Sequence, residues 1–364
     1  MIKIILPIVL FLIGYIVFII WQGGNPKNIL EEPTFQKITS QLPIPTLEPK
    51  ITLETPPQSK ILPNNYHIFQ SFNNCGPAAL SMALSYYGIN VSQQVLGQSL
   101  RPYQVPGGNN DDKSVTLEEL AEKSKEYGFI PYHRPNGNID LIKLFITYDI
   151  PIVTRTWLKE TEDIGHYRVV KGYDGDFLIQ DDSLQGKNLR YSADQFNAIW
   201  KKFNYEYLVL VPKEKIEIAE AILGENLDLK KSWQKAVEIS QNQLSQNPED
   251  ITARFNLSVA YYNMGDFKKS VEEFEKVENK LSFRTLWYQI EPILSFYELG
   301  NYERVFQITD KVLNYHNRAY SEAYLIRGNI YKRQGNIDLA RMEFEKAVQY
   351  NRNLKAAQDA LNNL

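Results

Sequence analysis

The chain contains a single cysteine, Cys75, and it stands where a helix is predicted to begin. The surrounding stretch is Gln70-Ser-Phe-Asn-Asn-Cys75-Gly-Pro-Ala-Ala-Leu-Ser-Met-Ala-Leu-Ser-Tyr-Tyr-Gly88, where Pro77 suits a first helical turn and Gly88 a helix end. A thiol there faces unpaired N–H groups and the positive end of the helix dipole, and both favour the reactive thiolate. Gln70 can present a side-chain amide beside the sulfur. These residues indicate a nucleophile with an oxyanion donor, although a lone cysteine beside an alanine-rich helix is also a common small core residue.

A cysteine nucleophile requires a base, and His166 is the best placed of four histidines. It opens a predicted strand, 166–173, which a tight Asp-Gly turn connects to a second strand, 176–180. The start of one strand lies opposite the end of its hairpin partner, so Asp181 is predicted to hold the imidazole. Asp182 is the alternative if the register shifts by one residue. The other histidines are interpreted as surface or packing residues: His67, His133 and His316.

The order and spacing of these residues resemble the peptidase C39-like family of papain-fold cysteine proteases. The resemblance covers residues 64–213 and rests on Gln70…Cys75-Gly-Pro-Ala-Ala-Leu, Thr116-Leu-Glu-Glu-Leu-Ala and Gly165-His166-Tyr-Arg-Val-Val-Lys-Gly-Tyr173. It implies Cys75 as the nucleophile and His166 as the general base and then acid. It also implies Asp181 as the residue that orients His166, and Gln70 with backbone N–H groups as the oxyanion hole. The family commonly has Asp-Pro at the third position, whereas this chain has Asp181-Asp182.

The elements that must position these residues alternate between helices and strands, which predicts an α+β domain over residues 64–213. Thr116 and Glu119 are spaced as a capping box at the start of one helix. The loop 102–112 is expected either to border the cleft or to be an ordinary surface loop. Helices are expected after Cys75 and over 92–99, 116–128, 139–148 and 192–200, and strands over 150–157, 166–173, 176–180 and 205–211.

Residues 216–364 are predicted to be helical throughout and repetitive. Gly265, Gly300 and Gly335 recur at intervals of 35 residues, each between two predicted helices. This pattern is similar to the tetratricopeptide repeat, a helix pair of roughly 34 residues. The middle repeat is degenerate, because Pro292 interrupts its first helix. Such a solenoid usually binds a peptide or protein on its concave face, and the alternative is that it only packs on the preceding domain or self-associates.

Residues 1–22 are predicted to form a single transmembrane signal anchor. Residues 4–21 are almost all apolar, which is just long enough to span a bilayer, and no small-residue cleavage site follows. An uncleaved anchor is therefore favoured over a cleaved signal peptide. Lys3 favours an N-terminus inside and C-terminal domains outside the cytoplasm. Residues 23–63, rich in Pro, Thr and Ser, are expected to be an extended linker.

Charge and spacing exclude several functions. A net charge of −3 over 364 residues argues against nucleic-acid binding. No residues have metal-ligand spacing and no glycine-rich phosphate loop precedes a helix, so neither a metal nor a cofactor is expected.

The sequence therefore predicts a papain-like α+β cysteine peptidase domain and an all-α tetratricopeptide solenoid behind one transmembrane helix. The expected activity is hydrolysis of peptide bonds outside the cytoplasm, with the repeats recruiting a peptide or protein partner. The alternative is a catalytically inactive, membrane-tethered adaptor that acts through its repeats. A transpeptidase or amidase also stays open, because it would form the same acyl-enzyme.

Overall fold

The structure is a computed structural model that describes residues 51–103, 115–314 and 317–364. These residues belong to one compact unit that begins at Pro49. The predicted transmembrane anchor, most of the predicted linker and nearly all of the loop 102–112 lie outside the described residues. None of the described helices combines the length and apolar character that crossing a bilayer requires.

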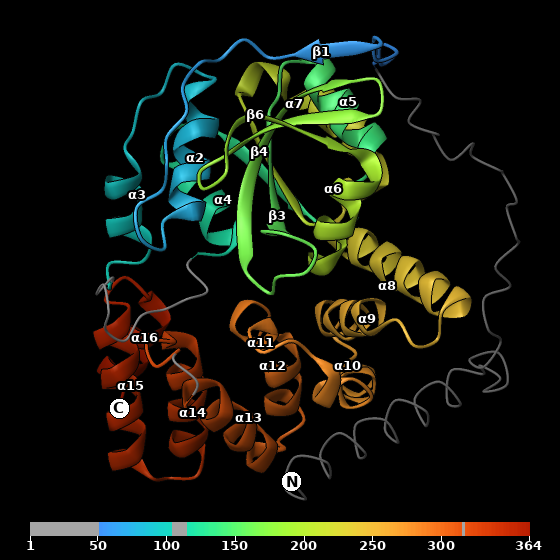
Figure 1. The fold of residues 1–364 in the computed structure, drawn as a ribbon. Helices are drawn as coiled ribbons and strands as arrows, with labels where there is room; N and C mark the ends of the chain where they lie inside the picture. The colour runs from blue at the N-terminus through green and yellow to red at the C-terminus, as the bar shows by residue number, and fades with distance from the viewer. Residues whose placement is uncertain (1–50, 104–114, 315–316) are drawn as a thin grey trace, which may run out of the picture. The chain divides into compact units, whose positions relative to one another are not determined.

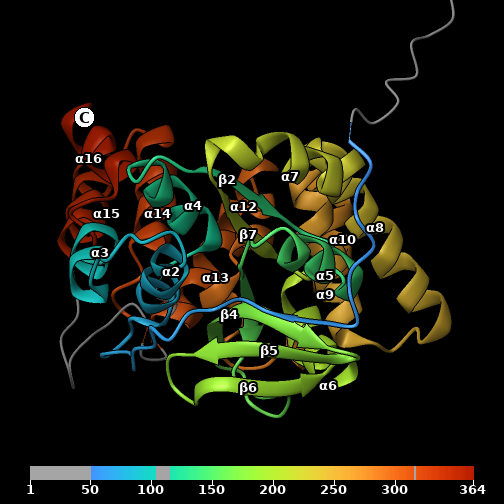
Figure 2. The same cartoon turned by 90° about the horizontal axis from the view of Figure 1, so that it is seen from above.

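A single antiparallel sheet forms the centre of the first part of the unit (Figures 1 and 2). Its strands follow the order β2-β7-β3-β4-β5-β6, and β1 pairs separately with β4. The antiparallel sheet with helices confirms the predicted α+β class. The strands are β1 (Ser59–Ile61), β2 (Ile130–Arg134), β3 (Ile152–Trp157), β4 (Gly165–Asp174), β5 (Phe177–Asp182), β6 (Gly186–Ser192) and β7 (Tyr207–Val211).

Helices cover both faces of this sheet, and each face has its own apolar core. Helices α2 and α4 pack on one face, where Leu80, Leu120 and Val169 are fully buried. Helices α5, α6 and α7 pack on the other, around Phe145, Trp200 and Val170. The helices are α2 (Cys75–Ser85), α3 (Gln93–Leu100), α4 (Leu117–Lys125), α5 (Ile139–Thr147), α6 (Ala193–Trp200) and α7 (Ile216–Leu223).

The helix starts confirm the local sequence signals. The Thr116 hydroxyl accepts from the Glu119 N–H at 3.1 Å, and the Glu119 carboxylate accepts from the Thr116 N–H at 2.7 Å. Both bonds of the predicted capping box are therefore present at the start of α4. Ser192 forms the corresponding cap on α6.

The end of the predicted linker differs from expectation, because β1 lies within it. Ser59 pairs with Asp174 and Ile61 with Gly172, so β1 extends the sheet along one end of β4. Leu62 follows β1 and is buried in the core of the α5 face. The prolines of this region suggested an extended spacer, and extended backbone is also what an edge strand requires.

Helices alone make up the described part of the chain from α8 onwards. Gly265, Gly300 and Gly335 have φ values of +78°, +72° and +77°, so each ends a helix in the left-handed conformation that glycine adopts most easily. The predicted break at Pro292 is confirmed, since that residue lies in the first turn of α12 just after the short α11. The helices are α8 (Leu229–Gln246), α9 (Ile251–Asn263), α10 (Phe267–Glu275), α11 (Thr285–Tyr288), α12 (Glu291–Glu298), α13 (Tyr302–Asn314), α14 (Ser321–Arg333), α15 (Ile337–Tyr350) and α16 (Lys355–Asn362).

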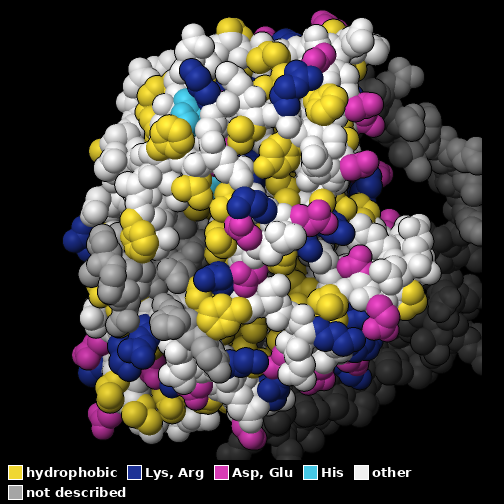
Figure 3. Space-filling view, in the orientation of Figure 1, with side chains coloured by type: hydrophobic (Ala, Val, Ile, Leu, Met, Phe, Trp, Pro, Cys, Tyr) yellow, Lys and Arg dark blue, Asp and Glu magenta, His cyan; other side chains and the backbone are white. Residues whose placement is uncertain are grey.

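The helical repeats contact the sheet-containing part at several places, and two ion pairs are among these contacts. Near α11, Arg284 forms an ion pair with Asp163 at 2.8 Å, in the loop between β3 and β4. Near α14, Glu322 forms an ion pair with Arg101 at 2.8 Å, at the end of α3. On the face shown in Figure 3, cationic and anionic side chains are mixed and not gathered by sign, in line with the small net charge.

The pairing of β1 with β4 predicts a specific effect of Gly172→Ala. A Cβ at Gly172 would lie 2.8 Å from the Lys60 carbonyl oxygen and 2.9 Å from the Ile61 Cα, and neither backbone atom can turn away as a side chain can. We expect the free energy of unfolding to fall by about 1–3 kcal/mol, measured by urea denaturation. Ser59→Ala, at the exposed end of β1, is the control and should change it little. An unchanged denaturation midpoint in Gly172→Ala would show that β1 does not pair closely with β4.

Candidate active site

Cys75 is the first residue of α2, as predicted. The preceding Asn74 does not cap the helix with its side chain, which instead donates to the Ser71 hydroxyl at 2.8 Å. The first turn contains no acidic residue. Its N–H groups and the helix dipole therefore favour an anion at this end of α2, such as a thiolate.

His166 forms a buried pair with Asp182. The His166 Nε2 atom lies 2.8 Å from Asp182 Oδ1, and the two side chains are 2% and 0% exposed. The same Asp182 oxygen accepts from the N–H groups of Leu184 at 2.7 Å and Gln185 at 2.9 Å. The other carboxylate oxygen lies 3.1 Å from Arg168 Nε. Asp182 is thus surrounded by donors and by one permanent cation, which stabilise its ionised form.

This geometry fixes the tautomer of the imidazole. An ionised carboxylate can only accept hydrogen bonds, so the proton of a neutral His166 must be on Nε2. The unprotonated nitrogen is then Nδ1, which is the atom that could take a proton from a nucleophile.

The pKa shifts agree with a neutral imidazole beside an ionised carboxylate. Burial lowers the pKa of His166 below its usual 6.5; the hydrogen bond and charge of Asp182 oppose this, and the charge of Arg168 adds to it. Burial tends to raise the pKa of Asp182, but the hydrogen bond and charge of His166, together with Arg168, outweigh it and lower that pKa to about 2. The His166 imidazole is therefore neutral near pH 7, and Asp182 is its anionic partner.

The prediction that Asp181 holds the imidazole is wrong in this structure. Asp181 is 1% exposed and forms a buried ion pair with Lys171 at 2.7 Å. It also accepts from the Asn188 N–H at 2.8 Å. The alternative residue, Asp182, occupies the place beside His166.

A β-bulge explains the change of residue. Gly172 pairs with Ile179, and continuing that register would place Asp181 opposite Val170, on the face of β4 that carries His166. The register shifts between Val170 and Gly172, and this adds one residue to β4. A one-residue shift exchanges the faces of the partner strand, so Asp182, opposite Arg168, reaches the face of His166.

Gln70 is held next to this pair by the residue after Asp182. The Gln70 N–H donates to the Ser183 carbonyl oxygen at 2.7 Å, and the Ser183 hydroxyl donates to Gln70 Oε1 at 2.9 Å. With its oxygen accepting from Ser183, the amide has its N–H groups left to donate. His67 Nε2 contacts the Asp182 carbonyl oxygen at 2.9 Å, so the segment before Cys75 lies along residues 182–183.

Helix α2 lies against β4, so Cys75 and His166 belong to two elements that pack together. A Cβ added to Gly76 would lie 3.4 Å from the ring of Tyr167, the residue after His166. Tyr167 in turn donates its hydroxyl to the Val115 carbonyl oxygen at 2.6 Å. Cys75 itself is only 7% exposed.

Sequence reasoning missed two members of the site, Arg168 and Ser183. Arg168 lies two residues after His166 and so shares its face of the strand, which the period of two could have indicated. Ser183 carried no signal, because its role depends on the register of the hairpin. Among the residues that the structure describes, no three His, Cys, Asp or Glu side chains are arranged to hold a metal ion.

The pairing of His166 with Asp182 predicts opposite results for the two neighbouring aspartates. Asp182→Asn removes the charge that raises the His166 pKa, so we expect that pKa to fall by about 1 or more. Asp181→Asn should leave it unchanged, although it too breaks a buried ion pair, which makes it a matched control for stability. NMR titration of the four histidine ring signals measures the His166 pKa, and the signal that is missing in His166→Ala identifies His166. A fall in Asp181→Asn alone would contradict the register described above.

Two sequence families match the chain, in separate segments. Residues 52–208 match the Peptidase_C39 like family. Residues 251–278 and 321–354 match the tetratricopeptide repeat, in agreement with two good repeats on either side of a degenerate one. No curated protein matches the chain significantly.

Three solved structures show limited similarity. A C39-like peptidase from Bacillus anthracis has 18% identity and a TM-score of 0.34, over 43% of this chain and 98% of that one. A double glycine motif protease from an AMS/PCAT transporter, in complex with the leader peptide, has 18% identity and a TM-score of 0.32, over 41% and 91%. A thermophilic TPR protein of Thermus thermophilus has 18% identity and a TM-score of 0.31, over 39% and 77%. The sequence matches, and not these distant likenesses, identify residues 52–208 as a peptidase C39-like domain that tetratricopeptide repeats follow.

Proposed function

We propose that this protein is a cysteine peptidase with Cys75 as its nucleophile. The observation that carries the proposal is the 2.8 Å contact between His166 Nε2 and Asp182 Oδ1 at the start of β4, the strand against which the cysteine helix packs. A buried histidine held by an ionised carboxylate, on the strand against which a cysteine-bearing helix packs, could supply the base that thiol hydrolysis requires. The match of residues 52–208 to a peptidase family supports the same reaction class.

In the proposed mechanism, His166 Nδ1 takes the Cys75 thiol proton as the sulfur attacks the peptide carbonyl carbon. Asp182 keeps the Nε2–H in place and stabilises the imidazolium that forms. The Gln70 amide and the N–H groups at the start of α2 donate to the oxyanion. When the carbon–nitrogen bond breaks, the imidazolium gives its proton to the leaving amine. Water then attacks the thioester, and His166 removes its proton to release the acid and regenerate the thiol.

A small cavity beside the start of α2 is our candidate for a substrate-binding subsite. It has a volume of about 220 Å³, and Phe72, Asn74 and Gly97 are among its lining residues. Phe72 is 47% exposed, so much of this large apolar side chain faces solvent. A substrate side chain that covered it would gain apolar contact.

The remaining parts of the proposal concern location and partners. The apolar residues 4–21 would anchor the protein in a membrane, with the described domains outside the cytoplasm. The repeats would bind a peptide or protein and bring it to the peptidase domain.

A second candidate function, a tethered adaptor without activity, is favoured by the burial of the site. Cys75 is 7% and His166 2% exposed, so little of either side chain faces solvent. In that case the peptidase-like domain would bind peptides or only support the repeats. Proteolysis by the purified chain separates the two functions.

Cleavage of unfolded protein and peptide libraries by the full chain in detergent micelles tests the peptidase proposal. We expect Cys75→Ala to abolish cleavage and the conservative Cys75→Ser to lose nearly all of it. His166 must be neutral to act as a base, and burial lowers its pKa, so the acidic limb of kcat/KM should lie below about pH 6.5. Absence of cleavage by the unaltered chain, or equal cleavage by Cys75→Ala, would favour the adaptor.

The proposed oxyanion donor predicts a loss in kcat for Gln70→Ala. Removing one such donor costs roughly 10²- to 10³-fold in kcat with little change in KM. Ser183→Ala is the matched control, because it removes the same side-chain hydrogen bond but leaves the Gln70 amide in place. Its loss should be much smaller. Equal losses in both variants would mean that Gln70 acts by supporting the structure and not by binding the oxyanion.

A further inference from the structure

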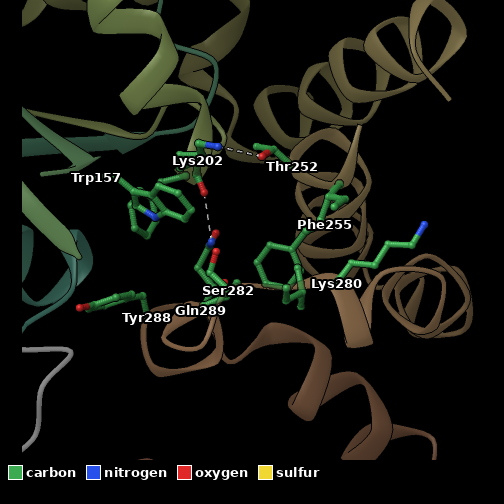
Figure 4. A pocket seen from close by; sticks show the side chains of 12 residues that line it. Trp157, Lys202, Thr252, Phe255, Lys280, Ser282, Tyr288 and Gln289 are labelled. Carbon is green, nitrogen blue, oxygen red and sulfur yellow. Dashed lines mark hydrogen bonds between the residues drawn. The ribbon is translucent and has the colours of Figure 1, made fainter. Parts of the chain in front are cut away.

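A second cavity lies between the end of the β3–β4 hairpin and the helical repeats (Figure 4). Its volume is about 220 Å³, and it is lined by residues of both parts of the unit. Trp157 comes from β3, Phe255 from α9 and Tyr288 from α11. Drug-sized ligands occupy pockets of roughly 300–1,000 Å³. This cavity therefore has room for something smaller, about one amino-acid residue.

Lys202 supplies a positive charge to this cavity. Its ammonium lies over the ring of Trp157, 4.4 Å from the ring centroid, and donates to the Thr252 hydroxyl at 3.2 Å. The ion pairs formed among the described residues do not include Lys202. Burial lowers its pKa, the charge of Lys201 lowers it further, and the charges of Asp250 and Glu160 oppose this. An anion in the cavity would supply the partner that this ammonium lacks.

Gln289 supplies an acceptor on the same wall. Its side chain is 3% exposed, and its Nε2 donates to the Lys202 carbonyl oxygen at 3.2 Å. Its Oε1 is buried and has no hydrogen-bond partner among the described residues. Figure 4 shows the amide beside Lys202, within the ring of residues that line the cavity. A buried carbonyl oxygen without a donor is unfavourable, and a ligand N–H would satisfy it.

The remaining walls are largely apolar and held in place by their neighbours. Phe255 and Tyr288 are 2% and 7% exposed. Tyr288 packs edge-on against Phe203, with ring centroids 6.2 Å apart, and its carbonyl oxygen accepts from Arg155 at 2.5 Å. An apolar or aromatic ligand side chain would find preformed contacts here.

We propose that this cavity binds an α-carboxylate together with the neighbouring N–H group and an apolar side chain. The carboxylate would pair with Lys202, the N–H would donate to Gln289 Oε1, and the side chain would lie among Trp157, Phe255 and Tyr288. Two sources carry this chemistry: the C-terminal residue of a peptide and a free amino acid. The cavity volume suits one residue in either case.

This site is separate from the proposed peptidase chemistry, because ligand binding here requires no reaction of Cys75. It nevertheless adjoins that site through the sheet. Trp157 pairs with Gly165, the residue before His166, and a Cβ at Gly165 would lie 2.9 Å from the Tyr288 ring. Trp157 and Tyr288, which the ligand would contact, thus lie against Gly165, the residue before His166.

Calorimetric titration of the full chain carrying Cys75→Ala tests the proposal, with three probes. N-acetylphenylalanine represents a peptide C-terminus, phenylalanine represents a free amino acid, and N-acetylphenylalaninamide lacks the carboxylate. We expect one of the two acids to bind at least about tenfold more tightly than the amide, as a charge-assisted hydrogen bond requires. Tighter binding of the acetylated acid assigns the site to peptide C-termini, and tighter binding of phenylalanine to free amino acids. Absence of binding by both acids, or equal binding by the amide, would overturn the proposal.

Two substitutions locate the binding. Lys202→Met keeps most of the side-chain volume and removes the charge, so it should weaken the acid about tenfold and leave the amide unchanged. Lys201→Met is the matched control, since Lys201 is the adjacent lysine and does not line the cavity. Equal effects of the two lysine variants would overturn the assignment. The comparison of acid with amide uses the unaltered cavity, so it decides the question even if Lys202→Met fails to fold.

Discussion

The buried carboxylate of Asp182 is the interaction on which the candidate active site depends. It lies between the imidazole of His166 and the guanidinium of Arg168, and all three side chains are almost completely excluded from solvent. A charge buried in this way is tolerated only when its partners remain in place, and removal of one partner typically costs about 3–5 kcal/mol. The same constraint fixes the tautomer of His166, because an ionised acceptor at Nε2 leaves Nδ1 as the unprotonated nitrogen.

The bulge in β4 sets the position of this carboxylate, and the segment before Cys75 is held next to it. The shift between Val170 and Gly172 brings Asp182 to the face of His166, and β1 pairs with β4 from Gly172 onwards. Ser183 then binds Gln70 through both a backbone and a side-chain hydrogen bond. The position of Gln70, the proposed oxyanion donor, therefore depends on the same hairpin register as the pair of His166 with Asp182.

Much of the fold could be predicted because its signals are local. The capping box at Thr116 and the glycines that end the repeat helices act through neighbouring backbone groups, and both were found where expected. Strands β2 and β6 were missed. Pro131 lies within β2 and β6 is mostly polar, so these strands exist through their pairing with β7 and β5 and not through their own composition.

The choice between the two aspartates shows the limit of local reasoning most clearly. Counting residues back from the turn favours Asp181, and only the bulge reverses this. One signal was available, since Lys171 is a charged residue inside a strand and is 3% exposed, so it needs a buried acid such as Asp181. That requirement removes Asp181 from the pair with His166. It becomes visible only once the two strands are known to be partners.

The helical repeats contact the elements that surround the candidate site. Tyr288 of α11 lies against Gly165, the residue before His166, and Glu322 of α14 binds Arg101 at the end of α3. Gly97 of α3 is in close contact with Asn74, which precedes Cys75. Elements on both sides of the candidate site thus contact the repeats. A ligand bound to the repeats near α11 or α14 would therefore lie next to residues of the peptidase-like domain.

The rate of Cys75 alkylation by iodoacetamide as a function of pH tests the central claim most directly, because the chain has one cysteine. The account predicts that the neutral His166 imidazole assists removal of the thiol proton, so that alkylation is fast well below the usual thiol pKa of about 8.5. It predicts that this reactivity is lost in His166→Ala and retained in Asp181→Asn. Slow alkylation that rises only through about pH 8.5, alike in all three proteins, would contradict it, since Cys75 would then be an ordinary buried thiol.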